Sequence, residues 1–518
     1  MLKNKYIYVV SLVVALGGFL MGFDASVISG VNRFIELEFD LSKIELGWAV
    51  ASLTLSSTIA MFIAGPLSDR ISRKHVLSIA AVLYTISAIG SAFAPSFILL
   101  VIARMIGGLG VGASLIIAPM YIAEMAPAEK RGSLVSLNQL NIVLGISVAF
   151  FTNYMILQLG KSDLGWVQTL QIDANNWRWM LGLETIPAIL YFIGLFFVPR
   201  SPRWLIMKGQ DEEAQLILNK VNTKEKAREA FAAVKESFEA EKDQEKRSFL
   251  DLFKPALKLV LLVGVVIGIL QQITGINAVF FYAPMIFEQS GIGTDASFVQ
   301  AILVGLTNLV FTVLAILFID KIGRKPLLIF GLAGIAICMF VLSYEFDKAT
   351  YTLQSDTVIE LPAAINQQQI SPMVGVTYDD DLTFKEALAN TLGEDVAQSY
   401  ESQLITLATD INATLILIGI IGFVASFAVS LGPVMWVLFS EIFPNYIRGL
   451  AISFVGLINS GVSFGVQLVF PWELANFGSA LTFLIYGAFA AAGLVFVIWI
   501  VPETKGKSLE ELEIYLAR

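Results

Sequence analysis

The hydrophobic pattern of this chain consists of long apolar runs separated by short polar segments. An α-helix of about 20 apolar residues crosses the hydrocarbon layer of a bilayer. Twelve runs of about this length are predicted to do so: about 7–30, 46–66, 76–94, 97–121, 134–156, 178–198, 257–285, 299–319, 326–345, 411–439, 450–470 and 479–501. The pattern therefore predicts an all-α integral membrane protein with twelve transmembrane helices.

The composition agrees with this pattern, because 56% of the 518 residues are hydrophobic and only 15% are charged. A soluble domain carries about 25% charged residues. The first apolar run is too long for a cleavable signal peptide, and the helix predicted there continues into residues that include polar side chains. We therefore expect this run to remain as a transmembrane helix.

The Lys and Arg residues gather on one side of the predicted membrane, which the positive-inside rule identifies as the cytoplasm. Both termini are then cytoplasmic, and the chain is predicted to lie in a plasma membrane or bacterial inner membrane. The exceptions are Arg33, Lys43, Lys161, Arg178, Lys348 and Lys385 on the other side, and Arg104 inside a span.

Three charged motifs each occur twice, and the second copy follows six spans after the first. The pairs are "DRISRK" (69–74) and "DKIGRK" (320–325), "EMAPAEKRG" (124–132) and "EIFPNYIRG" (441–449), and "VPRSPRWL" (198–205) and "VPETKGKSL" (501–509). Every copy lies at a predicted cytoplasmic end. The repeats therefore predict two homologous six-helix halves, related as parallel repeats.

The repeats also predict the domain boundaries. Residues 1–200 form the N-terminal half, 201–256 a cytoplasmic linker, and 257–518 the C-terminal half. The linker carries apolar residues at three- and four-residue spacing, which is typical of short amphipathic helices, although a solvated charged linker is the alternative.

The second half contains an additional polar stretch, from about 345 to 410, between its first and second motifs. We predict that it lies outside the cell, either as a small folded cap or as a mobile loop. Partial helix is expected around 383–407. Because the stretch is added to an otherwise complete scaffold, it is predicted to be dispensable for the chemistry of the protein.

The apolar stretch "GILQQITGINAVFFYAP" carries Gln271, Gln272 and Asn277. An amide without a partner in hydrocarbon costs several kcal/mol. The three amides do not share a face of one regular helix, but Gly275 offers a place where the helix can break and turn Asn277 toward the same cavity. The amides then either bind a polar substrate at mid-membrane or join neighbouring helices.

Asp24 and Arg104 are ionisable residues inside predicted spans. Each costs at least about 2.5–3.5 kcal/mol alone at the bilayer centre, so we expect them to pair. Burial favours the neutral acid, whereas a nearby guanidinium favours the carboxylate. Such a pair can exchange a proton as it opens and closes. A static buried ion pair is the alternative.

The sequence shows no constellation typical of an enzyme. It has one cysteine, Cys338, and one histidine, His75, and neither belongs to a metal-binding or catalytic pattern. "GGLGVG" (107–112) imitates a dinucleotide-binding motif but lies in an apolar run, where small residues let helices approach closely. We expect no catalytic residues, cofactor, metal or nucleic-acid partner.

The motifs together resemble the sugar porter family of the major facilitator superfamily, in particular bacterial xylose–proton symporters and facilitative glucose transporters. The resemblance covers nearly the whole chain except 345–410. It implies a transporter that works by alternating access, and we expect a functional monomer. The resembling stretches are "GFDASVISG" (22–30), "QQITGIN" (271–277), "DKIGRKP" (320–326), "GPVMWVLFSEIFP" (432–444) and "PETKG" (502–506).

The resemblance implies roles for particular residues. In the symporters the residue that matches Asp24 carries the proton, whereas the facilitators have Asn there, so Asp24 together with Arg104 implies sugar:proton symport. The substrate would be a hexose, pentose or related polyol. The alternatives are a proton-independent facilitator and a transporter-like sugar sensor. The implied sugar-binding residues are Gln139, Gln271, Gln272, Asn277, Tyr282, Asn308, Trp436 and Asn459.

The charged motif residues at the helix ends are expected to form ion-pair networks that hold the cytoplasmic gate shut. Exposed pairs are individually weak, but a network can bias an equilibrium between two conformations. These residues are Asp69, Arg70, Arg73, Glu124, Arg131, Arg200, Asp320, Arg324, Glu441 and Arg448.

Four positions depart from the family pattern. Arg200 stands where the family has Glu, and Ser72 stands where it has Gly. Phe281 and Ser460 each stand where the family has an aromatic residue that carries a polar group, so the transported sugar is expected to differ from xylose or glucose.

Overall fold

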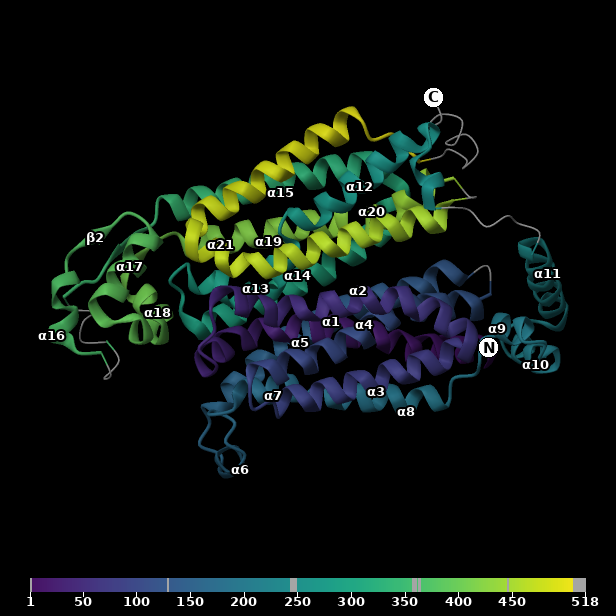
Figure 1. Ribbon diagram of the computed structural model, residues 1–518, viewed down its shortest axis with the longest axis horizontal. Helices are drawn as coiled ribbons and strands as arrows, with labels where there is room; N and C mark the ends of the chain where they lie inside the picture. The colour runs from purple at the N-terminus through teal and green to yellow at the C-terminus, as the bar shows by residue number, and fades with distance from the viewer. Residues whose placement is uncertain are drawn as a thin grey trace. The chain divides into compact units, whose positions relative to one another are not determined.

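The computed structural model describes residues 2–127, 130–242, 249–355, 361, 365–444 and 447–505 (Figure 1). Internal contacts divide the chain into two compact units. The first comprises Met1–Val27, Ser52–Thr152 and Leu159–Ser248, and the second comprises Ile28–Ala51, Asn153–Gln158 and Phe249–Arg518. Parts of three helices of the N-terminal half therefore belong to the second unit.

The described part of the N-terminal half consists of helices joined by turns and short loops, without a strand. Within the first unit α3 packs on α4, α7 and α8. The helices are α1 (Leu2–Glu38), α2 (Lys43–Ile71), α3 (Arg73–Ala92), α4 (Phe97–Met125), α5 (Arg131–Gly160), α6 (Gly165–Thr169), α7 (Asn176–Gly182) and α8 (Thr185–Phe196).

The "GGLGVG" glycines lie on α4 and allow close helix packing, as expected. A Cβ on Gly112 would lie 2.1 Å from the carbonyl oxygen of Ser57 on α2. A side chain at this position would force the two backbones apart, so only glycine permits the observed approach.

Three short helices follow in the linker: α9 (Pro202–Met207), α10 (Asp211–Val221) and α11 (Lys224–Lys242). The apolar residues of α10 at three- and four-residue spacing are buried, among them Ala214, Ile217 and Leu218. Ala214 and Ile217 join the hydrophobic core of the first unit. The amphipathic pattern of the linker thus forms helices in the predicted region.

The C-terminal half packs α15 on α19 and α21, and α12 on α21. Its membrane elements begin with two 3₁₀ turns, η2 (Phe249–Phe253) and η3 (Pro255–Leu257). The helices are α12 (Lys258–Ile273), α13 (Ile276–Glu288), α14 (Gly293–Ile322), α15 (Arg324–Asp347), α19 (Ala413–Val429), α20 (Leu431–Ile442) and α21 (Arg448–Trp499).

Eleven helical segments of the described chain are long and apolar enough to cross a membrane. The last of them, α21, has 52 residues and departs from helical geometry at Gly478, where φ is 72°. It therefore supplies two spans, which gives the twelve that the hydrophobic pattern predicts. Three other spans are each built from two helices in series: α7 with α8, α12 with α13, and α19 with α20.

The polar stretch between α15 and α19 forms a small folded cap. Its antiparallel sheet has the order β2-β1-β3, from β1 (Thr350–Thr352), β2 (Thr377–Tyr378) and β3 (Thr409–Asp410). Its helical elements are α16 (Gln367–Ile370), η5 (Ser371–Met373), α17 (Asp381–Leu392) and α18 (Glu394–Ala408). They are grouped beyond the end of α15 in Figure 1.

The cap has a hydrophobic core of its own. Phe384, Leu404 and Tyr351 are among its buried members, and the rings of Tyr351 and Phe384 stack with centroids 5.4 Å apart. Asp380 accepts a hydrogen bond from the N–H of Thr383 and so begins α17. The helix expected around 383–407 is present as α17 and α18, and the cap is the folded alternative rather than a mobile loop.

The turns between α2 and α3 and between α14 and α15 have the same backbone conformation. Ser72 has φ 90° and ψ 153°, and Gly323, its counterpart in the second copy of the motif, has φ 108° and ψ 163°. A residue with a Cβ is strained in this region. Ser72 therefore occupies a position for which glycine is suited.

Candidate functional site

The break between α12 and α13 lies at Gly275, where the sequence predicts it. Gly275 has φ 92°, and a Cβ there would lie 2.6 Å from the ring of Tyr486. The break turns Asn277 back toward the end of α12, so that its Nδ2 donates to Oε1 of Gln272 over 2.7 Å. Two amides that would face apart on a regular helix are thus joined.

Asn459 on α21 completes this amide cluster. Its Nδ2 donates to Oε1 of Gln271 over 2.7 Å, and its Oδ1 accepts from Nε2 of Gln272 over 3.2 Å. Gln271, Gln272 and Asn459 are 7–9% exposed. Four of the predicted binding residues therefore meet in one buried hydrogen-bonded cluster, in which each amide has partners from a neighbouring segment.

Two further polar residues on α21 extend the cluster and were missed by the sequence reasoning. Ser463 accepts a hydrogen bond from Nδ2 of Asn277 over 2.7 Å and another from Nε2 of Gln467 over 2.8 Å. Ser463 and Gln467 follow Asn459 at intervals of four residues, which places all three on one helix face. That spacing of polar residues within an apolar run was a usable signal.

Tyr282 contacts the same helix beyond the amides. Its hydroxyl donates to the carbonyl oxygen of Gln467 over 2.8 Å, and its ring centroid lies 5.2 Å from that of Phe470. Tyr282 itself has non-helical φ and ψ of −128° and 18°. It is therefore a fixed, fully buried contact between α13 and α21.

Three other predicted binding residues are not joined to this cluster by hydrogen bonds within the described chain. Asn308 is buried on α14. Trp436 on α20 is 47% exposed, and its ring centroid lies 6.0 Å from that of Phe439. Gln139 is exposed on α5, in the first unit.

Asp24 on α1 and Arg104 on α4 form the expected ion pair. An NH1 group of Arg104 lies 3.3 Å from Oδ1 of Asp24, and the side chains of Arg104 and Asp24 are 1% and 2% exposed, respectively. Among the described residues Oδ2 of Asp24 has no hydrogen-bond partner. A Cβ at Gly107 would lie 2.7 Å from that oxygen, so the glycine makes room for the carboxyl group.

Glu184 is a second buried acid at this ion pair, and the sequence reasoning missed it. It lies between α7 and α8, is 2% exposed, and interacts electrostatically with both Asp24 and Arg104. An acidic residue inside the predicted span 178–198 was the available signal, as it was for Asp24. The site therefore brings two acids and one guanidinium together in one buried cluster.

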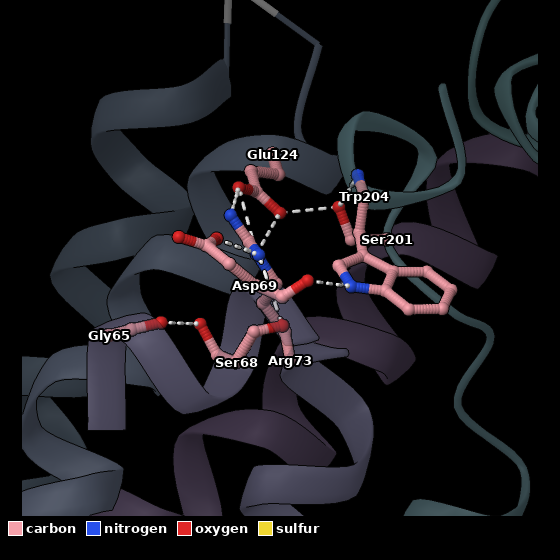
Figure 2. Close-up of polar contacts among 7 residues, drawn as sticks. All are labelled: Gly65, Ser68, Asp69, Arg73, Glu124, Ser201 and Trp204. Carbon is pink, nitrogen blue, oxygen red and sulfur yellow. Dashed lines mark hydrogen bonds and ion pairs between the residues drawn. The ribbon is translucent and has the colours of Figure 1, made fainter. Parts of the chain in front are cut away.

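The charged motifs form one network in each unit. In the first unit Arg73 donates to Glu124 over 3.1 and 3.2 Å and also pairs with Asp69 (Figure 2). The hydroxyl of Ser201 donates to Glu124, and the indole N–H of Trp204 donates to the carbonyl oxygen of Asp69 over 3.1 Å. The network thus joins the ends of α2, α3, α4 and α9.

The second unit repeats this arrangement. An NH2 group of Arg324 lies 2.8 Å from Glu441, whose other oxygen accepts from the hydroxyl of Thr504 over 2.6 Å. Glu503 accepts from the N–H groups of Arg324 and Lys325, each over 3.1 Å. The sequence repeat is therefore also a repeat of contacts.

The remaining motif residues have other partners. Arg200 pairs with Glu213 on α10 at 2.6 Å, so the departure from the family pattern has an acidic partner of its own. Arg131 and Arg448 donate to the carbonyl oxygens of Ala123 and Phe443 over 3.1 and 3.0 Å. Arg70 is exposed, and the side chain of Asp320 lies outside the described part of the chain.

The chain is similar to known transporters over nearly its whole length. The family described as "Sugar (and other) transporter" matches residues 10–363 and 398–516. The arabinose-proton symporter of Bacillus subtilis is 34% identical, with 98% of this chain and 94% of the relative covered. The D-xylose-proton symporter of Escherichia coli is 36% identical, with 99% and 96% covered.

Solved structures show the same similarity. An inward-open structure of the xylose transporter of E. coli superposes with a TM-score of 0.74 at 33% identity, covering 98% of this chain and all of that one. A structure of a proton:xylose symporter bound to 6-bromo-6-deoxy-D-glucose gives a TM-score of 0.70 at 35% identity, with 99% and 100% covered.

Proposed function

Because the chain belongs to the family of sugar (and other) transporters, and is thus a multi-pass membrane transporter rather than an enzyme, we propose that it is a sugar:proton symporter. It moves a monosaccharide across the cell membrane by alternating access. Two relatives that match nearly the whole chain are named proton symporters, one for arabinose and one for xylose.

The observation that carries the proton coupling is the buried site of Asp24, Arg104 and Glu184. When Asp24 is ionised, its attraction to Arg104 holds α1 and α4 together. Protonation removes that attraction, so the two protonation states favour different helix arrangements. A proton-independent facilitator has no need of a buried acid here, and the acid is costly to keep in a membrane span.

The amide cluster is the proposed sugar site. An amide offers both a donor and an acceptor, which matches the hydroxyl groups of a sugar. A bound monosaccharide would replace hydrogen bonds that Gln271, Gln272, Asn277 and Asn459 make with one another, so no buried amide loses its partners. By family resemblance we assign Tyr282, Asn308 and Trp436 to the same site, and we also assign a role in sugar binding to Gln139 of the first unit.

The orientation follows the distribution of basic residues. Both termini, the linker helices and the two charged networks face the cytoplasm. The networks fix the helix ends of each half and stabilise the conformation in which the cytoplasmic gate is shut. The functional protein is a monomer of two six-helix halves, 1–200 and 257–518, joined by the linker 201–256.

Sugar uptake into proteoliposomes tests the proposed function. Purified protein is reconstituted and offered a panel of hexoses, pentoses and inositols, with and without an inward pH gradient. We expect at least one sugar to be accumulated above its outside concentration only when the gradient is present. Equilibration of that sugar without accumulation would identify a facilitator, and binding without any movement would identify a sensor.

A further inference from the structure

The cap, defined as residues 349–411, is anchored on one side to α21. Asp381 at the start of α17 lies at the kink of α21, where a Cβ on Gly478 would be 2.8 Å from its Oδ1. The hydroxyl of Ser479 donates to the other carboxylate oxygen over 3.5 Å. The cap also follows α15 directly in the chain. It is therefore attached to two long helices of the second unit, α15 and α21.

The cap also contacts the end of α13. Lys385 on α17 donates to Oε1 of Gln289 over 2.7 Å, and Nε2 of Gln289 donates to Glu401 on α18 over 3.4 Å. Lys385 and Glu401 form an ion pair at 3.4 Å. Gln289 is the residue directly after α13, so the two cap helices hold that helix by its C-terminal end.

A second contact of the cap reaches α1 and α2. Gln398 on α18 donates to Oε1 of Glu36 over 3.3 Å, and the same oxygen pairs with Lys43 at the start of α2. Beneath this contact Arg33 on α1 lies 3.1 Å from Glu288 on α13. The ends of α1, α2 and α13 are therefore held together by one network, of which the cap supplies three side chains.

When these contacts break, water can reach the separated polar groups and hydrogen-bond to them. Beside the network lies a cavity of about 830 Å³, lined among others by Gln289, Lys385, Gln398 and Glu401. The side chains of Lys385 and Glu401 are 21% and 26% exposed. Water can reach these groups and can replace their hydrogen bonds when they separate.

The helix held by the cap also carries part of the amide cluster. α13 has 13 residues and begins next to Gly275, with Asn277 in its first turn. Its backbone departs from helical geometry at Tyr282, between the amides and the end that the cap holds. The end that the cap holds and the segment that carries Asn277 thus belong to one helix, with the contact of Tyr282 to α21 between them, and this helix links the cap to the site.

We propose that the cap is a latch for alternating access: Lys385, Gln398 and Glu401 fasten the ends of α1, α2 and α13 in one conformation and release them in each transport cycle. The inference rests on the proposed transport function for its role in the cycle. It revises the expectation that the insertion is dispensable, because a latch sets the balance between conformations even though it takes no part in binding sugar or proton.

Thiol labelling tests the latch independently of transport. Cys338 is the one cysteine of the chain, so Cys338→Ser gives a background for a single probe. Ser290→Cys places a nearly isosteric probe at a buried position next to Gln289. We expect Lys385→Met to raise the rate at which an impermeant maleimide labels this probe about tenfold, the equivalent of about 1.4 kcal/mol. Combining Lys385→Glu with Glu401→Lys restores the slow rate.

Two controls separate release of the latch from unfolding of the cap. Lys348→Met removes a lysine directly before the cap, which lies over the ring of Tyr344, and should leave the rate unchanged. Ala349→Cys is a probe in the cap core and should remain protected in every variant. If Lys385→Met also exposes the core probe, Gln398→Ala serves as the second variant, because it removes the contact with Glu36. We expect Gln398→Ala to expose the probe at position 290 and to leave the core probe protected.

Labelling of the probe at position 290 at the wild-type rate in both Lys385→Met and Gln398→Ala would overturn the latch. Rapid labelling of the charge-exchanged protein would do the same. A protein that transports no sugar but shows the predicted labelling pattern would contradict the proposed function and leave the latch in place.

Discussion

At the scale of single residues, the protein keeps two kinds of costly side chain in its membrane spans and satisfies them differently. The amides of Gln271, Gln272 and Asn459 satisfy one another through hydrogen bonds between α12 and α21. The acid Asp24 is paired through one oxygen with Arg104, and Glu184 lies nearby. The first arrangement suits a neutral ligand with many hydroxyl groups, and the second suits a proton.

The amide cluster gives the first prediction. Gln272→Ala and Asn277→Ala each remove an amide from the cluster, and the loss of a hydrogen bond costs about 1–3 kcal/mol. We expect each to weaken sugar binding about tenfold or more, since about 1.4 kcal/mol is tenfold in Kd. Isothermal titration calorimetry on the purified variants measures this.

Asn175→Ala is the matched control, because among the described residues the side chain of this half-buried asparagine donates within its own segment, to the carbonyl oxygen of Gln171. It should bind sugar with wild-type affinity. Wild-type affinity in both cluster variants would move the sugar site elsewhere.

At the scale of elements, the two halves repeat their turns as well as their helices. The turn before α3 and the turn before α15 both have a positive φ, but only the second has glycine there. Ser72 retains a cap in return, because its hydroxyl accepts from the N–H of His75 over 3.4 Å. That backbone bond is long and offsets little of the strain, and the same hydroxyl also lies 2.7 Å from Nδ1 of His75.

Ser72→Gly is therefore expected to stabilise the first unit. Relief of a residue in this backbone region is worth about 1–3 kcal/mol, and replacing a serine cap by glycine costs only a few tenths. A rise in the apparent melting temperature in detergent is the expected result. The reverse change, Gly323→Ser, should lower it, because a Cβ there would lie 2.8 Å from Glu503. A lower melting temperature for Ser72→Gly would show that the turn is not strained.

The cap gives a prediction about pH. Burial raises the pKa of Glu401, but the charges of Lys385 and Lys43 outweigh it and lower the pKa to about 2. A lowered pKa stabilises the folded state fully above the usual value of 4.5, and this contribution is lost as the pH falls through about 2. Across the range from about pH 7.5 to about 5.5 the latch should therefore not change.

Labelling of the Ser290→Cys probe at the two pH values checks this, with each rate normalised to that of an exposed cysteine. Glu401→Gln should raise the rate by the same factor at both ends of this range. If this factor instead grows between about pH 5.5 and about 7.5, Glu401 titrates within that range. That result would contradict the lowering of its pKa by Lys385 and Lys43.

At the scale of the whole molecule, the sequence predicts the spans and their repeat because both depend on local patterns. A run of apolar residues identifies a span whatever it packs against, and the break at Gly275 follows from one glycine between amides. The roles of Arg131 and Arg448 as donors to backbone carbonyl oxygens depend on the path of the chain at a helix end. The pattern of charged residues in the sequence does not determine the path of the backbone at these helix ends.

The residues that sequence reasoning missed are those whose meaning comes from a distant partner. In the sequence Glu184 is a single acid in an apolar run, and its role becomes visible only when the fold places Asp24 of α1 and Arg104 of α4 near it. Ser463 is likewise an ordinary small polar residue in the sequence, and its role follows from the break in the helix, which turns Asn277 toward it. The folded cap likewise depends on a core assembled from many short segments, which has no single period in the sequence.

We propose that a proton bound at Asp24 drives sugar across the membrane, and the Asp24→Asn variant tests this coupling. The asparagine keeps the size of the side chain and imitates the protonated, uncharged form. Sugar uptake into proteoliposomes is measured with and without an inward pH gradient, together with counterflow of the same sugar. We expect the variant to lose accumulation driven by the gradient but still to bind and exchange sugar. Accumulation of sugar by Asp24→Asn against its concentration gradient would contradict it, because the proton would then have to be carried by another group.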